Sequence, residues 1–265
     1  MTEHDGRTVD APVPIGSEAV WQGKSIAVVL PTYRERESIA DCIRAFQALG
    51  VVDEILVVNN NAEPGTSDAV ASTTAREVIE RTQGYGAAIQ RGLREVTADL
   101  VCICEPDNTF SPSDLFKLLP FTNECDVVFG SRTVSTFIWS GANMDWFLRW
   151  GNWAVAKLVE VLFNTTYLSD VGCTMRVMTS ECIARITPGF TSTGSRFGLE
   201  MQVLCAVNGE RIVQVPVNYH PRVGTSAVTG DRRAAWQLGC EMIGLVLRTR
   251  LRADAVRARL GKRTA

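Results

Sequence analysis

The sequence predicts an α/β fold: a Rossmann-like, mostly parallel sheet with helices on both faces, followed by C-terminal amphipathic helices. Short, continuously apolar runs recur along the first half of the chain, as in strands that are buried on both faces. Segments with helical spacing of apolar residues separate them, which favours right-handed crossovers between parallel strands. With 265 residues, of which 46% are hydrophobic and 21% charged, the chain can build one domain with a substantial core.

The first half supplies the predicted sheet. Strands are expected at 25–30, 54–58, 76–79, 100–104 and 126–129, and helices at 37–49, 84–96 and 115–119. Gly50 marks the end of the first helix, and Ser111 with Pro112 marks the start of the third. Ligands of such sheets bind beyond the carboxyl ends of the strands. One rim should therefore carry Pro31–Tyr33, Asn59–Asn61, Glu105–Asn108 and Ser131–Arg132.

The second half reads differently. Long amphipathic helices are expected at 144–164 and 231–250, and a further helix at 196–208 that ends at Gly209. The alternating segment 211–218 predicts a late strand, and its Pro216 indicates a sheet edge. We expect a flexible polar leader over 1–22, one domain over 23–250 and a basic tail over 251–265.

Composition excludes several classes of protein. The net charge of −2 argues against a general nucleic-acid binder. The eight cysteines form no CxxC pair and stand mostly among aliphatic residues, so we expect buried thiols in a reducing, cytoplasmic compartment. No segment reaches the ~18 continuous apolar residues of a membrane span.

Chemistry is expected directly after the strand at 100–104. Glu105 and Asp107 lie two residues apart at this strand end, so both carboxylates can face the ligand crevice. Hard oxygen ligands favour Mg²⁺ or Mn²⁺, which bind substrate phosphates as well. The alternative is a solvated acidic turn, which is common at strand ends.

The order of several short motifs resembles the family 2 inverting glycosyltransferases of the GT-A fold. The similarity is greatest to the branch of dolichyl- and polyprenyl-phosphate mannose or glucose synthases. It covers about 26–250 and rests on Val28–Tyr33 with Glu35, Glu54–Asn60, Gly84–Gly92, Glu105–Asp107, Val128–Arg132, Asp170–Arg176 and Ile212–Gly224.

This resemblance implies a role for each matching residue. The nucleotide of a GDP- or UDP-linked sugar would be bound by Pro31, Thr32, Tyr33, Glu35, Asn60, Gly84, Tyr85 and Glu105. Asp107 and Glu105 would hold the Mg²⁺ or Mn²⁺, although the family normally has Asp at the first position. Asp170, Asp107 and Arg176 would be catalytic, with Asp170 either a general base or an orienting group. The acceptor phosphate would be bound by Arg132, Arg149, Arg222 and Ser226.

The resemblance thus implies hexose transfer from a nucleotide-diphosphate sugar to a polyprenyl-phosphate-type acceptor. Tryptophans at 139, 146, 150 and 153 and the basic C-terminus suit peripheral contact with the inner face of a membrane, although core packing and a solvated tail explain the same residues. Gly224–Ala227 lacks the lysine often found in lipid-phosphate members, so transfer to a soluble hydroxyl acceptor stays open. A non-catalytic nucleotide-sugar binder is the other alternative. A nucleotidyltransferase would show a glycine-rich basic loop where Pro31–Glu35 stands.

Overall fold

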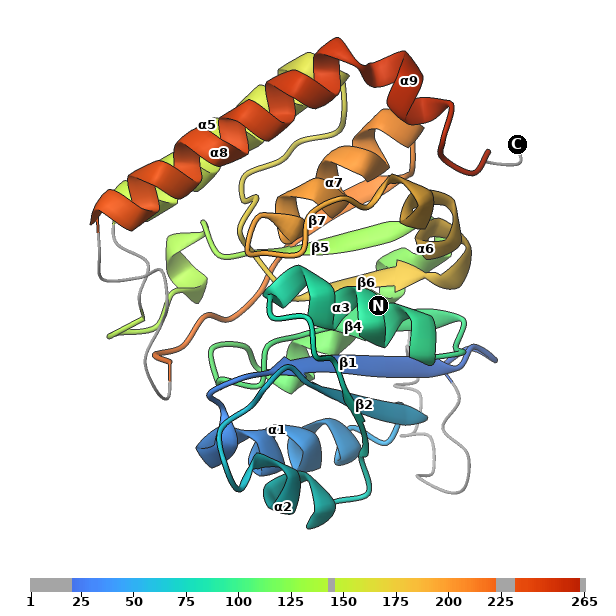
Figure 1. Cartoon of the computed structure of the whole chain (residues 1–265), viewed down its shortest axis with the longest axis vertical. Coiled ribbons are helices and arrows are strands. Elements are labelled where there is room, and N and C mark those ends of the chain that lie inside the picture. Colours follow the sequence, from blue (N-terminus) through green and yellow to red (C-terminus); the bar gives the residue numbers. More distant parts are fainter. Residues whose placement is uncertain (1–20, 143–145, 223–231, 263–265) are drawn as a thin grey trace, which may run out of the picture.

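The computed structural model describes residues 21–142, 146–222 and 232–262 (Figure 1). In the described part, seven strands form one sheet in the order β3-β2-β1-β4-β6-β5-β7. All neighbouring strands are parallel except β6, which runs antiparallel to both β4 and β5. The predicted α/β fold is confirmed. The strands span β1 (Ile26–Thr32), β2 (Glu54–Asn59), β3 (Arg76–Ile79), β4 (Leu100–Ile103), β5 (Val127–Ser131), β6 (Arg176–Thr179) and β7 (Ile212–Pro216).

Two apolar clusters, one on each face of the sheet, hold the helices in place. One face packs Val28 and Leu30 of β1 against α1, α2 and α4, which span Arg36–Gln47, Thr66–Ala71 and Leu115–Leu118. The other face packs Val29 against α3, α6 and α7, which span Tyr85–Glu95, Ser180–Ile186 and Phe197–Asn208. The alternation of β1 between these clusters explains why its residues are apolar without interruption.

The long helices α5 (Trp146–Phe163) and α8 (Arg232–Leu251) lie side by side as the outermost layer (Figure 1). No helix in the described ranges is long and apolar enough to cross a membrane. After α9 (Ala253–Arg257), Leu260 is buried and the Gly261 amide donates to the Arg185 carbonyl. The described part of the segment expected as a tail is therefore folded onto the domain. Short 3-10 helices cover Pro112–Asp114, Leu119–Asn123, Ser135–Phe137 and Thr187–Gly189.

The thiols are less uniformly buried than the sequence predicts. Cys42, Cys102, Cys104, Cys173, Cys182 and Cys205 are buried, but Cys125 is half-buried and Cys240 is exposed. Cys240 lies on α8, whose packing against α5 leaves part of its surface in solvent, so that its aliphatic neighbours do not imply burial.

Candidate active site

Three segments meet at one edge of the sheet. Because β4 and β5 are parallel to each other, the residues that follow them, 104–109 and 132–134, emerge at the same edge. β6 runs the opposite way, so the residues that precede it, 169–175, arrive at that edge too. The topology thereby brings Glu105, Asp107 and Arg132 to one edge, as the rim prediction requires, and adds Asp170, which that prediction did not include.

Glu105 and Asp107 share one arginine. Arg222 donates from Nε to Asp107 Oδ2 at 2.6 Å and from Nη2 to Glu105 Oε2 at 3.0 Å, and Nη2 also contacts Asp107 Oδ2. Asp107 Oδ1 accepts hydrogen bonds from the Thr109 amide at 3.0 Å and the Thr109 hydroxyl at 2.5 Å. The Asp107 side chain is 1% exposed and that of Glu105 is 24% exposed. The two carboxylates thus converge on one positive group.

Electrostatics explain why a cation is held at this point. Burial, and next the charge of Asp107, raise the pKa of Glu105 above its usual range, while Arg222 opposes this shift. Burial alone would lower the pKa of Arg222, but Asp107 and Glu105 outweigh it and raise that pKa. Without a cation, the buried Asp107 carboxylate and the half-buried Glu105 carboxylate would repel each other.

The donor chemistry of this pair fits a divalent cation. The Arg222 guanidinium stands in for such an ion, because one of its nitrogens already contacts oxygens of both carboxylates. Among the described residues, no group of three or more His, Cys, Asp or Glu side chains could hold a metal. A pair of carboxylates completed by substrate phosphates is a usual arrangement for Mg²⁺.

The predicted nucleotide pocket begins at the end of β1. Pro31 and Thr32 are buried, whereas the Tyr33 side chain is exposed. Glu35 Oε2 accepts from the Thr32 hydroxyl and from the amides of Tyr33 and Arg34 at 2.7–3.2 Å. Glu35 therefore fixes the turn after β1 and leaves the Tyr33 ring open to solvent, where it can meet a base.

Asn60 lies after β2, where the predicted nucleotide pocket continues. Its amide donates to the carbonyls of Glu80 and Thr82, and its Oδ1 accepts from the Gly84 amide at 2.8 Å. Gly84 has φ +144°, and a Cβ there would lie 2.3 Å from the Thr193 carbonyl oxygen. Asn60 and Gly84 thus form a structural junction between β2 and α3. The Asn60 side chain is thus engaged locally, and its contact with a nucleotide stays a prediction.

Tyr85 presents an unpaired hydroxyl close to the carboxylates. This hydroxyl is buried and makes no hydrogen bond within the described ranges. Burial, and then the charge of Glu105, raise the pKa of the Tyr85 phenol. It is therefore a neutral hydroxyl without a hydrogen-bond partner among the described residues.

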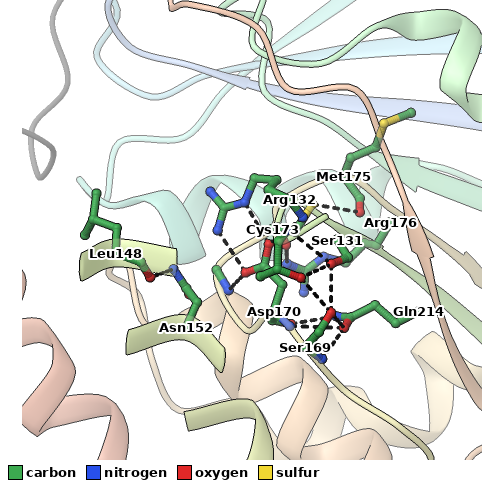
Figure 2. Close-up of polar contacts among 12 residues, drawn as sticks. Ser131, Arg132, Leu148, Asn152, Ser169, Asp170, Cys173, Met175, Arg176 and Gln214 are labelled. Carbon is green, nitrogen blue, oxygen red and sulfur yellow. Dashed lines mark hydrogen bonds and ion pairs between the residues drawn. The ribbon is translucent and has the colours of Figure 1, made fainter. Parts of the chain in front are cut away.

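Arg132 and Asp170 form a buried ion pair (Figure 2). Asp170 Oδ2 accepts from the Arg132 amide at 2.8 Å and Nε at 2.9 Å, while Oδ1 accepts from Arg132 Nη2 at 3.0 Å and the Gly172 amide at 2.8 Å. Burial alone would raise the pKa of Asp170, but Arg132 and these hydrogen bonds outweigh it and lower the pKa. Asp170 is thus a weak base with both oxygens engaged, which favours the orienting role.

Ser169 and Gln214, which the sequence analysis did not single out, complete this network (Figure 2). Gln214 Oε1 accepts from the amides of Ser169 and Asp170 at 2.6 and 3.0 Å, and its Nε2 donates to the Asp170 carbonyl at 2.6 Å. Gln214 stands between Ile212 and Pro216 on the face of β7 that carries the core residue Ile212. A polar residue at an inward position of an alternating strand was the signal that could have found it.

Arg176 lies in the core instead of on the rim. Its side chain is among the largest fully buried ones, and its guanidinium donates to the carbonyls of Cys173, Thr174 and Gly198 at 2.6–3.2 Å. The burial agrees with its place in a strand, but it removes the guanidinium from a substrate phosphate. The carbonyls before β6 and in α7 engage its donors, which favours a structural role, and the catalytic role stays a prediction.

A groove of about 570 Å³ opens beside the Arg132–Asp170 pair. Its floor carries hydroxyls, because Ser131, Thr133 and Ser169 lie within 2.9 Å of one another through their oxygens. One wall comes from a single stripe of α5, since positions three and four apart share a helix face. That wall consists of Trp146, Arg149, Trp150 and Trp153.

The arginines assigned to phosphate binding are therefore distributed over two places. Arg149 and Arg132 lie at or beside the groove, while Arg222 lies on the carboxylates. Ser226 lies outside the described residues.

Comparisons with known proteins identify the family. The family model "Glycosyl transferase family 2" matches residues 27–183, more than half of the chain. An uncharacterized glycosyltransferase of Mycobacterium tuberculosis (strain H37Rv) is 30% identical over 80% of this chain and 94% of its own length. An undecaprenyl-phosphate mannosyltransferase of Micrococcus luteus is 26% identical over 89% of this chain and 99% of its own.

The solved structures confirm the fold. Glucosyl-3-phosphoglycerate synthase from Mycobacterium tuberculosis, in complex with Mn²⁺, UDP-glucose and phosphoglyceric acid, superposes with a TM-score of 0.65. The match covers 91% of this chain and 86% of that one at 19% sequence identity.

Proposed function

Because the chain belongs to glycosyl transferase family 2, we propose that it transfers a hexose from a GDP- or UDP-linked sugar to a polyprenyl-phosphate-type acceptor with the help of Mg²⁺ or Mn²⁺. The observation that carries the choice of acceptor is the composition of the groove. It offers an arginine and aromatic walls, and none of its described lining residues is Asp or Glu. An acceptor hydroxyl needs a base to take its proton, whereas a phosphate is already anionic at neutral pH.

The donor half of the proposal rests on the residues after β1, β2 and β4. Tyr33 and the Asn60–Gly84 junction would flank the nucleoside, and Asp107 with Glu105 would hold the cation. When bound, the cation would neutralise the charge that gathers on the departing nucleoside diphosphate. The Tyr85 hydroxyl, which has no hydrogen-bond partner among the described residues, would donate a hydrogen bond to the nucleotide sugar. The solved neighbour in complex with Mn²⁺ and UDP-glucose supports the choice of cation and donor, and the relative named as an undecaprenyl-phosphate mannosyltransferase supports the choice of acceptor.

In this proposal, transfer is an in-line displacement. An acceptor phosphate oxygen bonds to the anomeric carbon as the bond to the nucleoside diphosphate breaks, which inverts the configuration. Arg132, which Asp170 holds in place, lies between the groove residues Ser131 and Thr133 in the chain and would supply positive charge beside the acceptor phosphate. Arg149, one turn from Trp146 and Trp153, would pair with the same phosphate while the indoles cover the isoprenoid. No step requires Asp170 to accept a proton.

A donor and acceptor panel tests the proposal. Each UDP- and GDP-hexose is supplied with Mn²⁺ or Mg²⁺, and a short-chain polyprenyl phosphate, phosphoglycerate and an alkyl glycoside serve as acceptors. We expect a glycosylated polyprenyl phosphate by mass spectrometry, at least ten-fold less of it for Arg149→Gln, and no loss for the exposed Arg44→Gln. Transfer to the glycoside alone would establish the hydroxyl-acceptor alternative instead. Nucleotide binding without turnover on any acceptor would establish a non-catalytic binder.

The outer helices support contact with an anionic membrane as part of this proposal. Trp146 and Trp150 on α5 are 72% and 61% exposed, and Trp236 on α8 is 67% exposed. Arg248 and Arg250 on α8, and Arg252 directly after it, are exposed as well. Indoles and arginines together suit the headgroup region. Co-sedimentation with phosphatidylglycerol vesicles at low salt, weakened by Trp150→Ser and by added salt, is the expected result; no binding at low salt would refute it.

A further inference from the structure

We propose that Arg222 is an internal competitor of the divalent cation, which occupies the two carboxylates until a nucleotide draws it away. This inference rests on the proposed use of a metal. It goes further, because it assigns Arg222 to the cation site and makes metal binding depend on the nucleotide.

The contacts of Arg222 leave little of the pair for a second cation. Asp107 offers Oδ2 to Arg222 and Oδ1 to Thr109, and Glu105 offers Oε2 to Arg222. Among these four carboxylate oxygens, only Glu105 Oε1 has no hydrogen bond to the described residues. A divalent ion that binds the two oxygens facing Arg222, Asp107 Oδ2 and Glu105 Oε2, must therefore take the position of the guanidinium.

Arg222 can exchange the two carboxylates for the phosphates of a nucleotide. Arg222 comes from the segment after β7, 115 residues beyond Asp107, so it can leave without displacing the strand end that carries the carboxylates. Its side chain is 19% exposed, which gives it a route towards the crevice. Phosphate oxygens offer the same two-pronged partner that the carboxylates provide. A nucleoside diphosphate can thus accept the guanidinium when the metal arrives.

The consequence is a coupling between two ligands. Without nucleotide, the metal must break the Arg222 contacts, and its affinity falls. With nucleotide, Arg222 exchanges carboxylate for phosphate, and this cost disappears. Linkage requires that the metal strengthen nucleotide binding by the same factor.

Mn²⁺ binding, measured by electron paramagnetic resonance of the free ion, tests the proposal without turnover. For Arg222→Gln we expect Mn²⁺ alone to bind at least about ten-fold more tightly than to the unaltered chain, given the strength of hydrogen bonds to charged groups. UDP or GDP should increase Mn²⁺ affinity strongly in the unaltered chain and less in Arg222→Gln. Arg222→Lys, which keeps the charge, should resemble the unaltered chain. Arg211→Gln is the matched control, because Arg211 pairs with the carboxylate of Asp126, away from this site.

The outcomes separate this inference from the proposed function. Equal or weaker Mn²⁺ binding by Arg222→Gln, with a circular dichroism spectrum and melting temperature like those of Arg211→Gln, overturns the competitor role while metal use stands. If Arg222→Gln does not fold, Arg222→Lys decides, because a lysine binds the carboxylates as a point charge. If UDP or GDP does not change the Mn²⁺ affinity of Arg222→Lys, the inference is overturned. Absence of Mn²⁺ binding with either nucleotide, in every variant, removes both proposals.

Discussion

Replacing Asp170 with asparagine should strongly destabilise the fold. The Asp170 side chain has no exposed surface and that of Arg132 is 12% exposed, so water cannot compensate either group. Asparagine keeps the shape, but its amide turns two N–H groups towards donors that now lack an acceptor. Removing one partner of a buried ion pair costs about 3–5 kcal/mol. For a domain of this size, a loss of ~3 kcal/mol lowers Tm by roughly 6–12 °C.

Urea denaturation followed by circular dichroism measures this loss. A double-mutant cycle with Arg132→Gln should return part of the stability, with a coupling free energy of at least about 1.5 kcal/mol. The control is Asp41→Asn in the exposed pair with Arg44, whose loss should stay within about 0.5 kcal/mol. A cost below about 1 kcal/mol for Asp170→Asn, or no coupling to Arg132, would refute the view that this pair is a rigid structural element.

Three further predictions follow. The pKa of Asp170 lies below its usual 3.8, so the stability that the Asp170 carboxylate contributes is present above that pH and lost as the pH falls through the folded pKa. The difference in unfolding free energy between the unaltered chain and Asp170→Asn should therefore be constant near neutral pH and should vanish in acid. Asp107→Asn should lose Mn²⁺ binding in the presence of UDP or GDP while the chain stays folded, which a cooperative melting transition in calorimetry can check. Gly84→Ala should cost about 3 kcal/mol in urea titrations because its Cβ would meet the Thr193 carbonyl oxygen at 2.3 Å, whereas Gly50→Ala, with φ +71° and no contact within 4 Å, should cost about 1 kcal/mol.

The sequence predicts the parallel part of the fold well, for a local reason. Uninterrupted apolar runs such as 26–30 are buried on both faces, and this property depends on the residues of one segment. The direction of β6 could not be predicted in the same way. Three of its four residues are buried, which does not depend on the direction of the strand, and only the pairing with β4 and β5 sets that direction.

The site shows the same division. Glu105 and Asp107 could be found because they follow a strand end, and Gly84 because a glycine before a helix signals a special backbone. The burial of Arg176 was indicated by Val177 and Met178, but its partners were not, since the Gly198 carbonyl lies on another helix. The contact between Arg222 and Asp107 joins residues 115 positions apart and has no local signature.

The Arg132–Asp170 pair also joins the two ends of the long segment between β5 and β6. Residues 133–169 leave the sheet after β5 and return before β6, and they carry α5 with the aromatic wall of the groove. The ends of this segment are fixed to each other by side chains and backbone at the point where it joins the domain. A segment whose two ends are fixed in this way can change its own conformation with little effect on the strands of the sheet.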